Sequence, residues 1–218
     1  MILANLQRYL VGKLMRTALY NRLLKDVIPY IRFTTYYTHP SNKEFQKWGA
    51  LANLGYGKLK PGHIVLTVDE KKLTTKLISQ FTGEEGFSHA AQCISKNGEF
   101  EIAEMTHTDF TKSTWHDLCY ESTRVVILEC EAYDDEYIEV LVKKTPSFEN
   151  TPYDNLFQMG IEALSCAELC YMYDSERRMN INLEPVLGSD PYISPMGLYK
   201  GTNMVTVWDS DTEIRKSH

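Results

Sequence analysis

Apolar residues recur every three or four positions in the first part of the chain. The repeat runs through Leu3, Leu6, Leu10, Leu14 and Ala18. This spacing places side chains on one helix face and predicts an amphipathic helix over residues 2–31. The segment is also basic, so two interpretations stay open. It contacts a membrane surface or a partner protein, or it packs on the chain's own domain.

Beyond this helix the pattern changes to short runs. Residues 38–62 are rich in Gly, Pro, Asn and Lys, which predicts a connector. Strands are predicted at 64–68, 89–95, 99–105, 125–131 and 204–208. Helices are predicted at 71–81, 137–143, 155–163 and 166–173. Strands and helices mix without regular βαβ alternation, so the expected fold class is α+β. We expect an N-terminal helical extension over 1–57 and one domain over 58–218.

An Asn-Gly pair separates two of the predicted strands and is a strong signal for a tight hairpin turn. With Asn97–Gly98 as the two turn residues, Ala91 pairs with Glu104. Side chains alternate between the faces of a strand, so Glu104 lies on the face of His89, one diagonal step away. A turn of three residues would move Glu104 to the opposite face.

One cysteine occupies the start of a predicted helix. The segment Ser165–Glu168 reads SCAE and matches the capping box S-x-x-E, which makes Cys166 the first helical residue. The free N–H groups and the positive end of the helix dipole favour a thiolate and can hold an oxyanion. The other cysteines have no such signal and are predicted to pack in the core: Cys93, Cys119, Cys130 and Cys170.

These residues form a candidate Cys–His–carboxylate triad. His89 would take the thiol proton, and Glu104 would orient the imidazole and stabilise its charged form. Cys166 would attack a carbonyl carbon and form an acyl-enzyme. His107 and Asp109 are the alternatives to Glu104.

The composition narrows the class of protein. The formal net charge is −6, which argues against a general nucleic-acid binder. Five cysteines, an odd number without a CxxC pair, argue against a disulfide scaffold or zinc knuckle and favour reduced thiols. No apolar run has the length of a transmembrane helix, and early basic residues interrupt any signal-peptide core. We expect a cytoplasmic or particle-associated protein.

Several short segments together resemble a known group. They read GHIVLT (62–67), FSHAA (87–91), IAE (102–104), YDNLF (153–157), SCAEL (165–169), and ISPMGLY with VTVW near the C-terminus. This set is similar to the YiiX/YebB-like branch of the circularly permuted NlpC/P60 superfamily, in which the histidine and acidic residue precede the cysteine. The resemblance covers roughly residues 58–210 and leaves the first 57 unexplained.

The resemblance implies a permuted papain-like core. In that core the cysteine helix packs on an antiparallel sheet or barrel that carries the histidine and a third polar residue. No cofactor or metal is implied, and the implied source is a bacterium or a phage. Tyr153 and His63 become candidates to bind substrate, although His63 stands where the family often has Asp. For Tyr153 the alternative is packing at the start of a helix that Asp154 caps.

Three functions follow as expectations. The first is a cysteine amidase or peptidase that acts through an acyl-enzyme on cell-wall-type or γ-glutamyl peptide amides. The second is a lipid thioesterase, phospholipase or acyltransferase on the same fold. The third is a non-catalytic structural or binding protein of a larger assembly, such as a phage particle. The expected partners are a peptide or lipid substrate with an amide or ester bond, and a membrane surface or protein at residues 2–31. No nucleic acid is expected.

Overall fold

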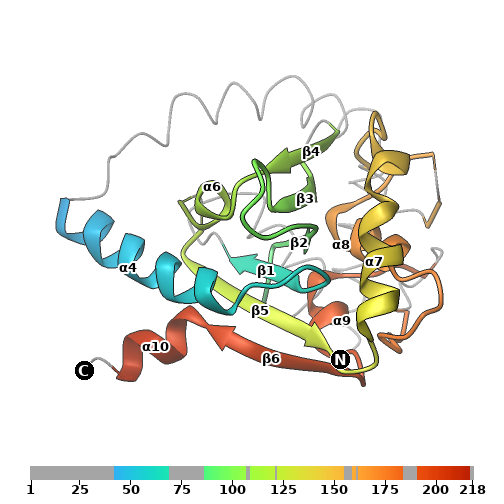
Figure 1. The fold of residues 1–218 in the computed structure, drawn as a ribbon. Coiled ribbons are helices and arrows are strands. Elements are labelled where there is room, and N and C mark those ends of the chain that lie inside the picture. Colours follow the sequence, from blue (N-terminus) through green and yellow to red (C-terminus); the bar gives the residue numbers. More distant parts are fainter. Residues whose placement is uncertain are drawn as a thin grey trace, which may run out of the picture.

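A computed structural model describes residues 42–68, 86–106, 109–120, 122–154, 159–160, 162–183 and 191–216. These residues contain a six-stranded sheet in the order β4-β3-β2-β1-β5-β6, and every neighbouring pair is antiparallel (Figure 1). The strands are β1 (Ile64–Val68), β2 (His89–Cys93), β3 (Ile102–Met105), β4 (Phe110–Ser113), β5 (Arg124–Cys130) and β6 (Met204–Asp209). The antiparallel sheet and the helices around it confirm the predicted α+β class.

Helices pack on both faces of the sheet. They are α4 (Asn42–Lys58), α6 (Trp115–Tyr120), α7 (Asp135–Lys143), α8 (Cys166–Tyr173), α9 (Pro195–Tyr199) and α10 (Ser210–Lys216), with a short 3-10 helix, η2 (Thr145–Phe148). Val65 shares an apolar cluster with Trp115 of α6. Its neighbour Leu66 belongs to a second cluster, with Ala167 of α8 and Leu198 of α9. Because successive strand residues point to opposite faces, the central strand β1 is apolar on both.

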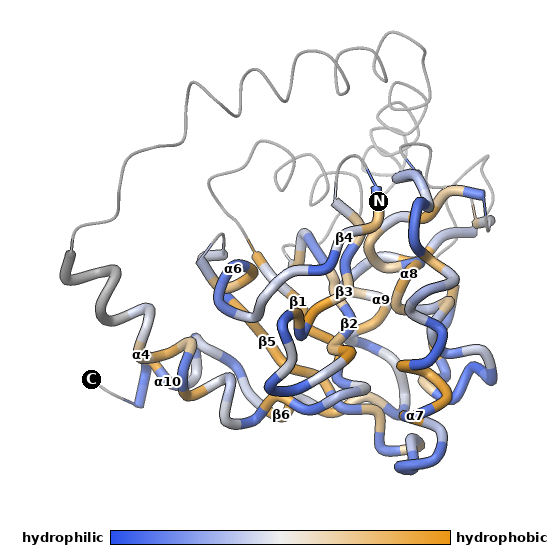
Figure 2. Tube along the Cα trace, turned by 45° about the horizontal axis from the view of Figure 1, so that its top comes forward, coloured by the Kyte–Doolittle hydropathy of each residue, from blue (hydrophilic) through white to orange (hydrophobic). Residues whose placement is uncertain are grey.

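Hydropathy follows this layered arrangement. Figure 2 shows apolar residues (orange) along β5 and polar residues (blue) along the outer loops. Within the described ranges, no helix combines the length and the apolar character that a membrane span requires.

The connector predicted over 38–62 is wrong for most of its length, because Asn42–Lys58 form helix α4. Its glycines each lower the local preference for helix by about 1 kcal/mol, and tertiary packing outweighs this preference. The indole N–H of Trp115 donates to the Ala52 carbonyl at 2.8 Å. A Cβ on Gly55 would lie 2.7 Å from the Trp115 ring, so the glycine lets α4 approach that ring closely.

Most of the other predicted elements are confirmed. The predictions at 64–68, 125–131, 204–208, 137–143 and 166–173 correspond to β1, β5, β6, α7 and α8. The helix predicted over 155–163 is wrong where the structure describes it, since 159–160 and 162–163 are not helical. The chain instead forms a short parallel bridge between Tyr153 and Leu164.

The helices predicted at 2–31 and 71–81 lie outside the described residues. Helix α4 crosses the predicted domain boundary at residue 58, and that division stays a prediction.

The β2–β3 hairpin has the predicted register but a different turn. Ala91 pairs with Glu104, as predicted. A type I′ turn needs positive φ at both central residues, and of Asn97–Gly98 only Asn97 has it, at 62°. The strands therefore end earlier than predicted. The Ile94 N–H donates to the Glu101 carbonyl at 2.8 Å and holds the register across the connection.

Candidate active site

Cys166 is the first residue of α8, and the predicted capping box is present. The Ser165 N–H donates to Glu168 Oε2 at 2.7 Å, and the Glu168 N–H donates to Ser165 Oγ at 3.4 Å. In the first turn of a helix, N–H groups have no carbonyl four residues earlier within the helix. The capping box satisfies two of these groups. The N–H groups of Cys166 and Ala167 therefore remain suited to bind an anion beside the sulfur.

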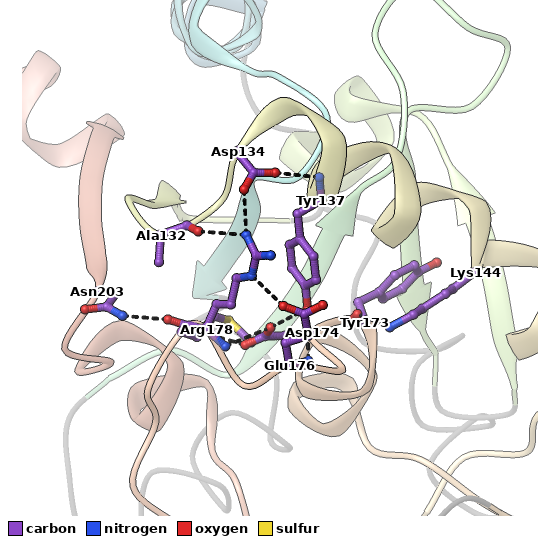
Figure 3. A network of polar contacts seen from close by, with 10 residues as sticks. Ala132, Asp134, Tyr137, Lys144, Tyr173, Asp174, Glu176, Arg178 and Asn203 are labelled. Carbon is purple, nitrogen blue, oxygen red and sulfur yellow. Dashed lines mark hydrogen bonds and ion pairs between the residues drawn. The ribbon is translucent and has the colours of Figure 1, made fainter.

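The far end of α8 is anchored by a buried carboxylate. Asp174 accepts hydrogen bonds from the Tyr137 hydroxyl at 2.7 Å and from the N–H groups of Arg178 and Met179 at 3.0 and 2.8 Å. The Arg178 guanidinium lies 4.0 Å from the centroid of the Tyr137 ring and pairs with Asp134 (Figure 3). Since Tyr137 and Asp134 belong to α7 and its N-cap, this network ties α8 to α7.

His89 and Glu104 meet across the β2–β3 pair. His89 Nε2 lies 2.8 Å from Glu104 Oε2. The predicted register is the cause, since Ala91 pairs with Glu104 and His89 is one diagonal step away. Of the alternatives to Glu104, Asp109 is exposed and forms a bridge with Pro152. His107 lies outside the described residues.

The imidazole of His89 is held in its charged form. Burial alone would lower the pKa of His89, but hydrogen bonds to Cys166 and Glu104 outweigh it and raise the pKa to about 10. Because Nε2 is engaged by Glu104, the hydrogen bond to the cysteine falls to the other ring nitrogen, Nδ1. One ring therefore connects the carboxylate to the sulfur.

The second oxygen of Glu104 has a partner that sequence reasoning missed. The Ser113 hydroxyl donates to Glu104 Oε1 at 2.5 Å. Ser113 ends β4, a four-residue strand whose sequence, FTKS, has little apolar alternation. The one available signal was the continuation of the hairpin, since a third antiparallel strand beside β3 would place polar residues opposite Glu104.

Tyr153, a predicted substrate-binding residue, lies beside Cys166. The bridge to Leu164 brings it there, with the Asp154 N–H donating to the Leu164 carbonyl at 3.0 Å. Its hydroxyl is hydrogen-bonded to the Cys166 side chain. Burial, followed by the negative charges of Cys166 and nearby carboxylates, raises the pKa of Tyr153 well above its usual value. The hydroxyl therefore stays neutral and can donate to the sulfur or to an oxyanion.

His63, the other predicted substrate-binding residue, is not brought together with Cys166. The Cys93 N–H donates to the His63 carbonyl at 2.8 Å, so His63 lies beside Cys93. His89 is four residues away along β2, which is about 13 Å at 3.3 Å per residue. Both ring nitrogens of His63 are buried without a hydrogen-bond partner, and Nε2 lies 3.9 Å from Glu129 Oε1. Burial lowers the pKa of His63 to about 4.

The other cysteines are buried packing residues, as predicted. Burial raises the pKa of Cys93 to about 12 and that of Cys130 to about 11. Burial also raises the pKa of Cys119 and that of Cys170 well above the usual value. Their thiols are therefore protonated at neutral pH. Within the part of the chain that the structure describes, no three His, Cys, Asp or Glu side chains are grouped so as to hold a metal ion.

Comparison with known proteins identifies a structural relative. No family model matches the chain, and a search of curated proteins gives no match. Among solved structures, the chain is similar to the metalloprotein yiiX from Escherichia coli O157:H7, described as DUF1105. The two are 13% identical, the match covers 69% of this chain and 97% of that one, and the TM-score is 0.61. This protein therefore shares the fold of yiiX, the protein for which the branch suggested by its sequence motifs is named.

Proposed function

We propose that this protein is a cysteine hydrolase with a permuted papain-like fold and a triad of Cys166, His89 and Glu104. One observation carries the proposal: His89 bridges the side chain of Cys166 and the carboxylate of Glu104. A buried structural cysteine has no need for a charged imidazole partner, whereas a nucleophile needs both the imidazole and an orienting group.

The proposed reaction begins with the proton of the Cys166 thiol on Nδ1 of His89. The sulfur, at the N-terminus of α8, attacks the carbonyl carbon of the substrate. The N–H of Cys166 and the hydroxyl of Tyr153 donate to the oxyanion that forms. The tetrahedral intermediate collapses, His89 gives its proton to the leaving group, and an acyl-enzyme remains. His89 then takes a proton from water, and the hydroxide attacks the acyl carbon. The C–S bond breaks, which releases the acid and leaves the Cys166 thiolate beside the protonated His89.

The proposed substrate is an amide in a peptide of the cell-wall or γ-glutamyl type. Although the similar solved structure is described as a metalloprotein, the described residues here include no group of side chains arranged to hold a metal ion. No step is therefore assigned to a metal.

The proposal is tested by trapping the acyl-enzyme. The protein is mixed with an activated acyl ester, quenched in acid and mapped by peptide mass spectrometry. We expect the acyl group on the peptide that contains Cys166, and none on that peptide in Cys166→Ser. The His89→Ala variant should acylate more slowly by about 100-fold or more, the usual contribution of a general base. Acylation confined to other residues would refute the assignment. A panel of peptide amides and acyl thioesters then separates the peptidase from the lipid-directed alternative.

A further inference from the structure

Ser113 lies beside the triad without touching the nucleophile. In the β3–β4 pair, Ile102 is opposite Ser113 and Glu104 is opposite Thr111. Ser113 is therefore a diagonal neighbour of Glu104 on the same face of the sheet. Its hydroxyl donates to Glu104 Oε1 at 2.5 Å, while Oε2 of the same carboxylate binds His89 at 2.8 Å.

We infer that Ser113 is a positioning residue, which acts on the nucleophile through Glu104 by holding that carboxylate charged and correctly oriented. This inference rests on the proposed function, and it extends the hydrogen-bonded series by one residue: Ser113, Glu104, His89, Cys166.

Two physical reasons support this role. The last torsion of a glutamate side chain is soft, so a bond to Oε1 also fixes where Oε2 points. A hydroxyl donated to a carboxylate favours the charged form and is stronger than a bond between neutral groups. The Glu104 side chain is only 13% exposed, so water can replace the hydroxyl only in part. The ammonium group of the neighbouring Lys112 is engaged by Glu149, at 2.6 Å.

The test uses substitutions that differ only in the hydroxyl. Ser113→Thr keeps it, and Ser113→Val has nearly the shape of threonine without it, so both share any effect on packing. The rate of Cys166 alkylation by iodoacetamide is measured at pH 6 by peptide mapping. We expect Ser113→Val and Ser113→Ala to react about tenfold more slowly than wild type, the low end for a hydrogen bond to a charged group. Ser113→Thr should react within about twofold of wild type.

A matched control is Ser122→Ala. Ser122 is a partly buried serine whose hydroxyl donates to the Leu118 carbonyl at 2.7 Å. Its replacement should leave the alkylation rate unchanged while lowering the thermal midpoint by an amount similar to Ser113→Ala. A merely structural role for Ser113 would give the same pattern as this control.

A double-mutant cycle shows whether Ser113 acts through Glu104. In a Glu104→Gln background, Ser113→Val should slow alkylation no further, because there is no carboxylate left to position. An equal slowing in both backgrounds, or a wild-type rate in Ser113→Val alone, overturns the inference. The His89→Ala variant separates the two proposals. If it reacts like wild type, the triad and the role of Ser113 both fail. If it is slow while Ser113→Val is not, only the role of Ser113 fails.

Discussion

His63 directly precedes β1 and His89 begins β2, and the pKa values of the two histidines are shifted in opposite directions. His63 has no hydrogen-bond partner for its buried ring, and burial lowers its pKa to about 4. Burial acts on His89 in the same direction, but bonds to Cys166 and Glu104 raise its pKa to about 10. The stability of the protein therefore depends on pH through His63 below neutral pH and through His89 above it. The contribution of His89 is complete below pH 6.5 and is lost as the pH rises through about 10.

The His63→Phe substitution should make the protein more resistant to acid. Between pH 6.5 and 4 the unfolded chain binds a proton at this position and the folded protein does not, so stability falls with pH. From pH 7 to 4.5, wild type should lose roughly 2–3 kcal/mol more than His63→Phe in urea unfolding. Equal losses in His63→Phe and wild type would show that the folded protein accepts a proton at His63.

At the scale of elements, the start of α8 combines a stabilising cap with the proposed nucleophile, Cys166. Removing the cap in Ser165→Ala should lower the free energy of unfolding by about 1 kcal/mol. It should also slow Cys166 alkylation, because the first helical turn is no longer fixed.

The control for this prediction is a second capped helix. Ser194 caps α9, where its hydroxyl accepts from the Gly197 N–H at 2.9 Å. Ser194→Ala should cause a similar loss of stability in denaturant unfolding and leave the alkylation rate at the wild-type value. If Ser165→Ala is alkylated as fast as Ser194→Ala, the capping box is not needed for the reactivity of Cys166.

Helix α4 provides a matched pair of glycines. A methyl group on Gly55 would meet the Trp115 ring at 2.7 Å, whereas on Gly57 it would meet nothing within 4 Å. Gly55→Ala should therefore destabilise the protein by about 1–3 kcal/mol through overpacking. Gly57→Ala should stabilise it by about 0.5–1 kcal/mol through helix propensity. Thermal unfolding of both variants measures the difference. Stabilisation by Gly55→Ala would mean that α4 does not approach Trp115 as described.

The elements that the sequence predicted correctly depend on local interactions. The capping box involves four consecutive residues, and the hairpin register follows from residues near one turn, so the positions of Cys166 and Glu104 could be predicted from the sequence. Helix α4 and strand β4 could not. The glycines of α4 disfavour helix, and its stability comes from distant residues such as Trp115. The contact between Ser113 and Glu104 depends on a strand whose sequence has weak apolar alternation, so it could not be predicted from the sequence.

At the scale of the whole molecule, the sheet and its helices assemble the site from segments far apart in the sequence. Strands β2, β3 and β4 contribute His89, Glu104 and Ser113, and helix α8 packs against β2 and β3 with Cys166 at its start. The structural match to yiiX covers 97% of that chain, so the two proteins share the fold that carries these segments. His63 lies beside Cys93, at the end of β2 opposite to His89. The motif resemblance did not predict this distance between His63 and Cys166.

The proposed role of Cys166 is tested most directly by its rate of alkylation by iodoacetamide between pH 5 and pH 9, with peptide mapping of all five cysteines. We expect Cys166 to react fastest and to react already at pH 6, where a free thiol is almost entirely protonated. We also expect His89→Ala to slow it by about tenfold or more at that pH. If Cys166 reacts like a free thiol, no faster with His89 than without it, the cysteine is a packing residue and the hydrolase proposal is wrong.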